Sequence, residues 1–269
     1  MRPVHYCSLI PVYLESIFKD KTNDDPIVLS SATGCLYKHD NKIYLITNWH
    51  VLSGRHSINR KILNPNLATP EIIKVHFPLD SDTTQQINKD FELKNSNDEF
   101  LWLEHHESNK IDVGILEIDP PNGIATKYIS DLPNSTNPVG EDYFFVTQDV
   151  WVIGFPRGIR AGGMPLWKSA TIATEPIVST KEHLHKVILD TATREGMSGS
   201  PVLYVNKTLS KVRFDGTNHT VDLPSVKLML GIYSGRIAGD DELAAQLGIA
   251  WKQECILEII VSGRNYIEK

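Results

Sequence analysis

The sequence predicts an all-β protein built as one domain from two β-barrel halves. From residue 27 onward, short apolar runs alternate with clusters of Gly, Pro, Asn and Asp, which is the pattern of a sandwich or barrel. The length of 269 residues suits one large β domain. No internal repeat divides the sequence, and the stretch 120–142 is predicted to link two sets of strands.

The two sets of predicted strands belong to an N-terminal half of about residues 1–125 and a C-terminal half of about 140–250, within one domain over 1–269. Strands are expected near 27–30, 33–38, 42–47, 71–77, 100–104 and 112–118, then near 150–155, 166–174, 186–190, 201–205 and 226–234. The secondary structure of residues 1–26 is ambiguous. The stretch 78–99 is predicted to be an exposed excursion between strands, and 206–224 a polar loop or the tip of a hairpin. Apolar residues at Cys255, Ile256, Ile259 and Ile260 share one helical face, which predicts a closing helix over about 252–262.

The composition is that of an ordinary globular protein, with 41% hydrophobic and 22% charged residues. A net charge of −6 gives no basic surface for nucleic acid. No apolar run approaches the roughly 18 to 20 residues that cross a bilayer, and the N-terminus lacks the features of a secretory signal. Cys7, Cys35 and Cys255 are odd in number and widely spaced, so we expect isolated buried thiols in a reducing cytoplasm.

A serine in a glycine-rich turn is the first candidate for chemistry. Residues 195–202 read Glu-Gly-Met-Ser-Gly-Ser-Pro-Val, which places Ser198 between Gly196 and Gly199 and just before an apolar strand. A nucleophilic serine needs such a turn because backbone N–H groups must converge on an oxyanion, and glycine allows that close approach. Taken alone, the turn is more typical of a simple connection between strands.

Two further segments complete a possible triad. His50 follows an apolar strand, and Asp112 lies at the start of another, where a carboxylate is costly to bury unless it is paired. The order His50, Asp112, Ser198 is the triad order of the chymotrypsin class. An α/β-hydrolase would carry G-x-S-x-G and a histidine after the acid. Here Ser200 replaces the second glycine, and the only histidine after Ser198 is His219, in a polar loop.

Each of these residues also has a purely structural interpretation. His50 lies between apolar neighbours and, taken alone, is more typical of a core histidine, while Asp112 alone could be a strand-edge residue. Other candidates for the acid or base lie nearby in the sequence: Glu104, His105, His106 and Asp119. None of them begins an apolar strand as Asp112 does.

Assembled in order, the motifs resemble the trypsin-like (chymotrypsin-fold) serine proteases, especially bacterial enzymes related to the HtrA proteases. The matching segments are Thr-Gly-Cys-Leu-Tyr at 33–37 with Leu-Ile-Thr-Asn-Trp-His-Val at 45–51, Asp-Val-Gly-Ile-Leu at 112–116, Val-Ile-Gly-Phe-Pro at 152–156, Gly-Met-Ser-Gly-Ser-Pro at 196–201 and Gly-Ile-Tyr-Ser-Gly at 231–235. Any one motif is a weak signal, but all five in order are a strong one. The resemblance covers about residues 31–256.

The resemblance implies two perpendicular six-stranded β-barrels with a C-terminal helix and an active site between the barrels. It implies that Ser198 is the nucleophile, that His50 is the general base and acid, and that Asp112 orients the imidazole. The backbone N–H groups of Gly196 and Ser198 are the implied oxyanion hole.

The resemblance also implies where the substrate binds. Backbone atoms of Ser234 and Arg236, which flank Gly235, would pair with the substrate as an added strand. Ala192 falls at the base of the primary specificity pocket, so a small or apolar P1 residue is expected. Met197 occupies the position where animal trypsins have an acidic residue, so trypsin-type zymogen activation is not expected.

We therefore expect a cytoplasmic serine endopeptidase that hydrolyses peptide bonds through an acyl-enzyme. Its expected partners are a protein or peptide substrate and a regulatory protein, without nucleic acid or membrane. The alternative is a catalytically silent protease-fold module that binds peptides or proteins. No cofactor or metal is expected, because His183 and His185 flank a strand without a matching cluster of Cys or carboxylate residues.

Overall fold

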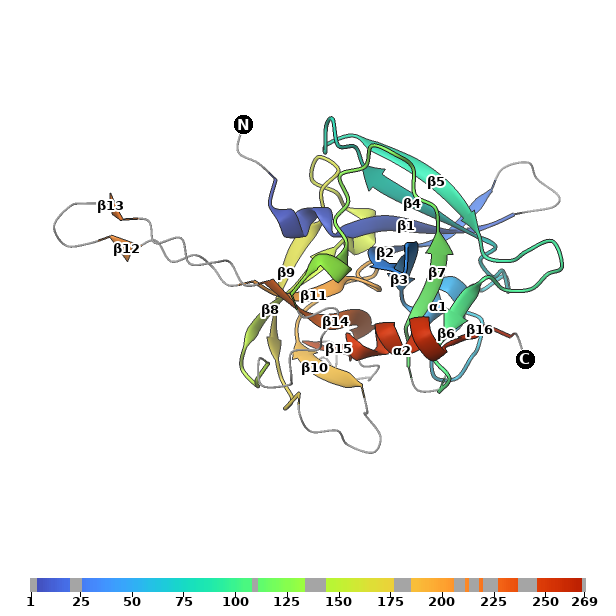
Figure 1. The fold of residues 1–269 in the computed structure, drawn as a ribbon. Coiled ribbons are helices and arrows are strands. Elements are labelled where there is room, and N and C mark those ends of the chain that lie inside the picture. Colours follow the sequence, from blue (N-terminus) through green and yellow to red (C-terminus); the bar gives the residue numbers. More distant parts are fainter. Residues whose placement is uncertain are drawn as a thin grey trace.

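The computed structural model of the chain describes residues 4–19, 26–107, 111–133, 144–176, 185–205, 211–212, 218–219, 227–236 and 246–267, which form mainly antiparallel β-sheet (Figure 1). The strands are β1 (Pro11–Phe18), β2 (Ile27–His39), β3 (Lys42–Thr47), β4 (Ile72–Pro78), β5 (Gln86–Glu92), β6 (Trp102–Glu104), β7 (Gly114–Ile118), β8 (Asp149–Gly154), β9 (Leu166–Ile172), β10 (Lys186–Asp190), β11 (Pro201–Val205), β12 (Lys211–Val212), β13 (Asn218–His219), β14 (Lys227–Arg236), β15 (Leu247–Lys252) and β16 (Arg264–Asn265). The helices are α1 (Trp49–Ser53) and α2 (Glu254–Ser262), with 3-10 turns η1 (Tyr6–Leu9), η2 (Ile129–Asp131) and η4 (Pro156–Gly158).

Six strands of the second half close into a barrel, as expected, in the order β10-β15-β14-β11-β8-β9. Successive side chains of a strand point to opposite faces, so alternate residues fill the barrel interior. Val150 and Val152 of β8 and Val187 and Leu189 of β10 are buried in this way.

The first half forms an eight-stranded sheet in the order β16-β6-β7-β3-β2-β1-β4-β5. This sheet includes β1, β5 and the late strand β16, which were not among the strands predicted for this half. The residues of β5 are at most half-buried, so this edge strand lacks the apolar alternation that marks a strand in sequence. Closure of this sheet into a second barrel, and a perpendicular arrangement of the two halves, stay predictions.

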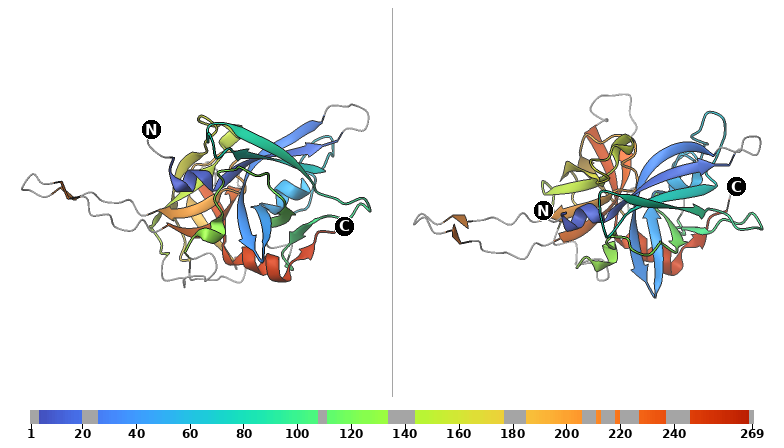
Figure 2. Two further views of the ribbon diagram at one scale, coloured as in Figure 1. Left: turned by 45° about the horizontal axis from the view of Figure 1, so that its top comes forward. Right: turned by 90° about the horizontal axis from the view of Figure 1, so that it is seen from above.

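Other differences from the sequence interpretation are local. The ambiguous N-terminal stretch contains β1, the predicted excursion at 78–99 contains β5, and β15 was not predicted. Strands expected at 27–30 and 33–38 are one continuous strand, β2. In the region expected to form a loop or hairpin tip, β12 pairs with β13 apart from both sheets (Figure 2). Part of the predicted linker, at 134–142, lies outside the described residues.

One apolar core joins the two halves. Helix α2, close to the range predicted for a closing helix, contributes the buried residues Ile256 and Ile259 to this core. They pack in one cluster with Ile46 and Ile115 from the first sheet and Ile232 from the barrel. Burial of this shared surface fixes how the halves meet.

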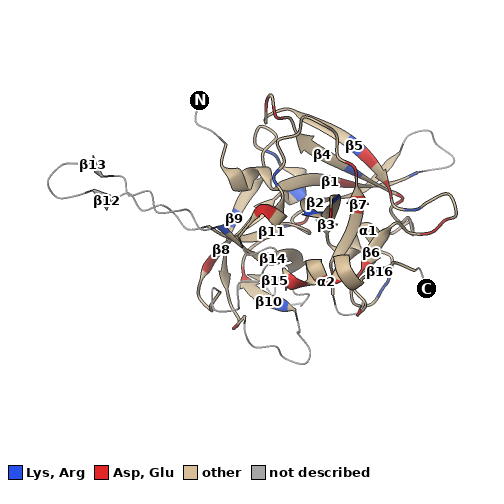
Figure 3. Cartoon of the chain, viewed as in Figure 1, with Lys and Arg blue, Asp and Glu red and all other residues tan. Residues whose placement is uncertain are grey.

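The charged residues form a mixed surface. Figure 3 shows Lys and Arg interspersed with Asp and Glu along the described elements. Within the described ranges, no helix is both long and apolar enough to cross a bilayer.

The late strand β16 stabilises the first sheet through a cluster of aromatic rings. Tyr266, just after β16, stacks on Trp102 at 4.6 Å and meets Trp49 edge-on at 5.6 Å. Its backbone N–H donates to the carbonyl of Trp102. Trp49 begins α1, so this cluster supports the helix that carries His50.

We expect Tyr266→Ala to lower the free energy of unfolding by about 3 kcal/mol, because it leaves a cavity among buried aromatic rings. Ile267→Ala is the matched control, since that side chain is 70% exposed, and it should change stability little. Urea unfolding measures both variants. Equal unfolding midpoints for the two would contradict the role given to the aromatic cluster.

Candidate active site

The turn that carries Ser198 depends on two glycines with positive φ. Gly196 has φ +88°, and a Cβ there would lie 2.4 Å from the Phe155 carbonyl oxygen. Gly199 has φ +83°, and a Cβ there would lie 1.9 Å from the Thr33 carbonyl oxygen. Only glycine fits either position without displacing backbone. The Gly-x-Ser-Gly pattern is therefore a geometric requirement of this turn.

Both halves of the fold hold the serine turn in place. Thr33 of β2 donates from its hydroxyl to the Gly196 carbonyl and from its backbone N–H to the Ser198 carbonyl, each at 2.8 Å. From the barrel side, the Gly199 N–H donates to the Tyr233 carbonyl at 2.8 Å. Ser198 is thus fixed at the junction of the first sheet and the barrel.

The backbone next to Ser198 presents free N–H groups. The Glu195 carbonyl accepts a 2.6 Å hydrogen bond from the Arg157 N–H, which is positioned by the left-handed backbone of Arg157 (φ 51°, ψ 30°). The C=O and N–H bonds of a trans peptide point in opposite directions, so the Gly196 N–H points away from Arg157. Among the described residues, neither this N–H nor that of Ser198 has an acceptor. Such a pair can bind an anionic oxygen.

His50 is positioned by a short helix capped against the neighbouring strand. It is the second residue of α1, and Gly54 ends that helix in the left-handed conformation. The Asn48 amide donates to the Asp112 backbone carbonyl at 2.7 Å, which ties the start of α1 to the segment before β7. The backbone N–H of His50 donates to Asp112 Oδ1 at 2.9 Å.

The Asp112 carboxylate binds the His50 ring. Asp112 is 2% exposed, and its Oδ2 lies 2.7 Å from His50 Nδ1. A carboxylate can only accept here, so Nδ1 carries the proton and Nε2 is left free to take another. Ser234 Oγ donates to the same Oδ2 at 2.5 Å. The predicted partnership of His50 with Asp112 is therefore present, with a third residue that the sequence did not indicate in this role.

The electrostatics of this pair favour a protonated imidazole. Burial alone would lower the pKa of His50, because desolvation disfavours the charged form. The charge of Asp112 and its hydrogen bond act in the opposite direction and outweigh burial, so the pKa of His50 is raised above its ordinary value. His50 is thus a stronger base than a free histidine.

His50, Gly196 and Ser198 line one cleft of about 430 Å³ between the two halves. Its other walls come from 29–31 of β2, from the segment 54–70 after α1, and from Arg157 and Glu195. Within the described part of the chain, no hydrogen bond joins Ser198 Oγ to His50. The structure brings the predicted nucleophile and base into one cleft without that bond.

The four residues predicted to bind substrate do not line this cleft. Ala192 is exposed to solvent, and the Ser234 hydroxyl is directed to Asp112. Gly235 and Arg236 belong to β14, where they pair with Ile249 and Gly248 of β15, and the Arg236 side chain lies outside the described atoms.

A buried tyrosine occupies the space beside the predicted specificity pocket. Tyr233 is 1% exposed, and its hydroxyl is hydrogen-bonded to Thr193 Oγ1. A Cβ added to Gly248 of β15 would lie 2.5 Å from the Tyr233 ring. The ring therefore fills the volume between the 191–193 segment and β15.

The alternative acids have other partners. Glu104 is buried and accepts from Trp49 Nε1 at 2.8 Å and from Arg264 Nε at 3.1 Å, so it is a structural carboxylate. The Asp119 side chain is 98% exposed and lies beside Lys89. Neither contacts His50.

We expect the pKa of His50, followed by NMR of its imidazole, to lie above the ordinary histidine value. Asp112→Asn should bring this pKa below the ordinary value, because the carboxylate charge is lost while burial still disfavours the imidazolium. Asp119→Asn is the matched control and should leave the His50 titration unchanged. A His50 pKa that is the same with and without the Asp112 charge would contradict the proposed coupling.

Comparisons with known proteins identify the family and the fold of the chain. The profile of the trypsin-like peptidase domain matches residues 32–209. The Rv3671c protease from M. tuberculosis, in its active form, has 15% identity and a TM-score of 0.50, over 97% of this chain and 85% of that one. A variant of the HtrA-type protease AlgW with a tripeptide has 16% identity and a TM-score of 0.50, over 96% of this chain and 60% of that one. At these identities the two structures show a shared fold.

No curated protein matches the chain. The family profile spans more than half of the sequence, so the chain belongs to the trypsin-like peptidase family.

Proposed function

We propose that the protein is a serine endopeptidase in which Ser198, His50 and Asp112 form the catalytic triad. The observation that carries the proposal is the buried Asp112 carboxylate, bonded to His50 Nδ1 in the cleft that Ser198 also lines. Catalytic hydrogen bonds are often long before substrate binds. The missing bond between Ser198 and His50 is therefore compatible with a functional triad.

Hydrolysis would proceed in two steps. His50 Nε2 takes the Ser198 hydroxyl proton as Oγ attacks the scissile carbonyl carbon, and it then gives that proton to the leaving amine. Water, deprotonated by His50, attacks the resulting ester and releases the acid and free Ser198. Asp112 stabilises the imidazolium that forms in each step.

The proposed oxyanion hole consists of the Gly196 and Ser198 N–H groups. The anchored Glu195 carbonyl supports this assignment, because it keeps the Gly196 N–H directed away from Arg157. Each donor in such a site lowers the barrier by roughly 3–4 kcal/mol.

Control by trypsin-type activation is not part of the proposal. Met197 is fully buried in the apolar core of the barrel. A new N-terminal ammonium brought to this position would meet a thioether rather than a carboxylate.

The expected peptide-binding edge is the end of β14. Strand β11 begins at Pro201, opposite Ile232, so the backbone at 234–236 has no neighbouring strand on that side within the described residues. A substrate strand can add there through main-chain hydrogen bonds. We propose a protein or peptide substrate, and a regulatory protein as a further partner. The three buried free cysteines suit a reducing compartment, and we propose the cytoplasm.

A fluorophosphonate probe should label the wild-type protein covalently at neutral pH. Ser198→Ala should abolish labelling, because the attacking oxygen is removed. His50→Ala should slow labelling by about 10²–10⁴-fold, because the general base is lost. Intact-mass spectrometry measures the attached group. His76→Ala, a histidine outside the cleft, is the control and should label at the wild-type rate.

Failure of the folded wild type to label would contradict the proposed nucleophile. That result would favour the alternative function, a protease-fold module that binds peptides or proteins without cutting them. Labelling that persists in Ser198→Ala would place the reactive group elsewhere.

The substrate preference is proposed to depend on Tyr233. Because its ring fills the space beside the 191–193 segment, little volume remains for a P1 side chain. We therefore propose cleavage after small apolar residues, which agrees with the neutral residue Ala192 nearby.

Removal of the ring should widen the preference. In Tyr233→Ala, the ratio of kcat/KM for a Leu or Phe P1 residue to that for Ala should rise at least about tenfold. Tyr233→Phe is the matched control, since it keeps the ring and loses only the hydroxyl, and it should retain the small P1 preference. A peptide library resolves both outcomes. Cleavage by the wild type mainly after Lys or Arg would overturn the proposal.

A further inference from the structure

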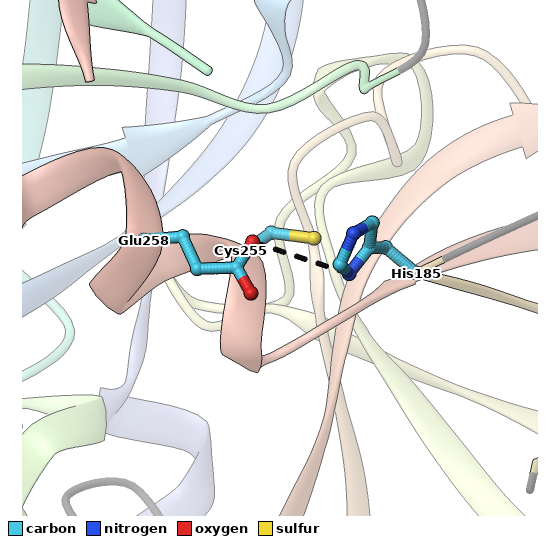
Figure 4. A group of neighbouring side chains, drawn as sticks. All are labelled: His185, Cys255 and Glu258. Carbon is cyan, nitrogen blue, oxygen red and sulfur yellow. Dashed lines mark ion pairs between the residues drawn. The ribbon is translucent and has the colours of Figure 1, made fainter. Parts of the chain in front are cut away.

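Outside the cleft, three metal-binding types of side chain converge at one point. The imidazole of His185, the thiol of Cys255 and the carboxylate of Glu258 each have a donor atom within 4.8 Å of the other two (Figure 4). None of the three lines the candidate active site. The sequence interpretation expected no such cluster around His185, and His183 lies outside the described residues.

The three residues come from two parts of the fold. Cys255 and Glu258 are on α2, three positions apart, so they share one face of the helix. His185 directly precedes β10 of the barrel, in a left-handed conformation with φ 72°. Its carbonyl accepts from the Lys252 N–H at 2.7 Å, which holds it beside the start of α2.

A fourth residue positions the carboxylate. His105 Nδ1 accepts from the Glu107 N–H at 3.1 Å, so Nε2 carries the ring proton. His105 Nε2 then donates to Glu258 Oε2 at 2.9 Å. The His105 side chain is 2% exposed, so this hydrogen bond is shielded from water on the His105 side. Groups that bind a metal ligand in this way are a regular part of metal sites.

We propose that His185, Cys255 and Glu258 bind a zinc ion, and that His105 positions the Glu258 carboxylate. A thiolate with an imidazole selects zinc over the hard cations magnesium and calcium. Zinc bonds of about 2.0–2.3 Å place neighbouring donors about 3.3–3.8 Å apart. Small side-chain rotations would bring the present donors to that spacing, with water as the fourth ligand.

Binding exchanges a proton for the metal. The Cys255 S–H bond breaks as the Zn–S bond forms, the sulfur keeps the electron pair, and the proton leaves to solvent. Burial, with the charges of Glu258 and Glu254, raises the pKa of Cys255 well above its ordinary value, so without metal the thiol is protonated. His185 and Glu258 are both partly exposed, which gives the ion a path from solvent.

The proposed ion would act as a structural link. Helix α2 packs against β6 and β7 of the first sheet, whereas His185 directly precedes β10 of the barrel. A metal held by α2 and by His185, the residue before β10, would join the two halves at a point that shares no residue with the cleft. This inference does not depend on the proposed peptidase activity.

Cobalt substitution tests the site directly. The full chain, freed of metal by a chelator, is titrated with Co²⁺, and we expect one equivalent to produce a thiolate-to-cobalt charge-transfer band. Cys255→Ser should abolish this band. Cys7→Ser, which removes another buried thiol, is the matched control and should retain it.

Competition with a chromophoric chelator then measures zinc affinity. We expect His185→Gln to weaken binding at least about tenfold, since one ligand is lost, and His105→Ala to weaken it about 10–100-fold. His105→Gln should recover part of this loss, because its amide can still donate to Glu258. Mg²⁺ and Ca²⁺ should not compete.

The absence of a charge-transfer band in the wild type would overturn the proposal, as would a band that persists in Cys255→Ser. If that variant does not fold, His185→Gln decides the outcome, because its side chain is partly exposed. Unchanged zinc affinity in folded His185→Gln would exclude the site. None of these measurements requires peptidase activity, so they remain informative even if the catalytic proposal fails.

Discussion

The buried carboxylate of Asp112 is the constraint on which the candidate site depends. A charge removed from water is strongly destabilising unless hydrogen bonds replace its hydration. Here the replacements are the His50 backbone, the His50 ring and the Ser234 hydroxyl. Two of these donors come from α1 of the first half and one from β14 of the barrel. The same bonds that make burial of the charge tolerable therefore fix the orientation of the imidazole.

The turn that carries Ser198 is likewise held by hydrogen bonds from the first sheet. Thr33 bonds to both Gly196 and Ser198, and its hydroxyl also accepts from the Phe155 N–H at 3.1 Å. A residue of the first sheet thus holds two loops of the barrel at once. Together with the Asp112 bonds, this means that the candidate site exists only where the halves are docked. The shared apolar core around α2 supplies the main driving force for that docking.

Residues whose role is evident from their immediate neighbours in the sequence could be predicted from it. The glycines around Ser198, and the charged Asp112 among apolar residues, each show their constraint within a few positions. Tyr233 and Ser234 could not be assigned their contacts, because these depend on strands that pair only in the folded chain. The edge strand β5 has no clear apolar pattern, because its residues are exposed or only partly buried and Phe91 alone packs against the core of the sheet. His185 and Cys255 are far apart in sequence, and only the approach of α2 to β10 brings them together.

The pairing of β16 with β6 has a consequence for the order of synthesis. Residues that complete the first sheet and support α1 are made after every residue of the barrel. A chain still emerging from the ribosome can contain His50, Asp112 and Ser198 while the base of α1 is unsupported. The support that Tyr266 gives to α1, and with it the final position of His50, can therefore form only after all strands of the barrel have been synthesised.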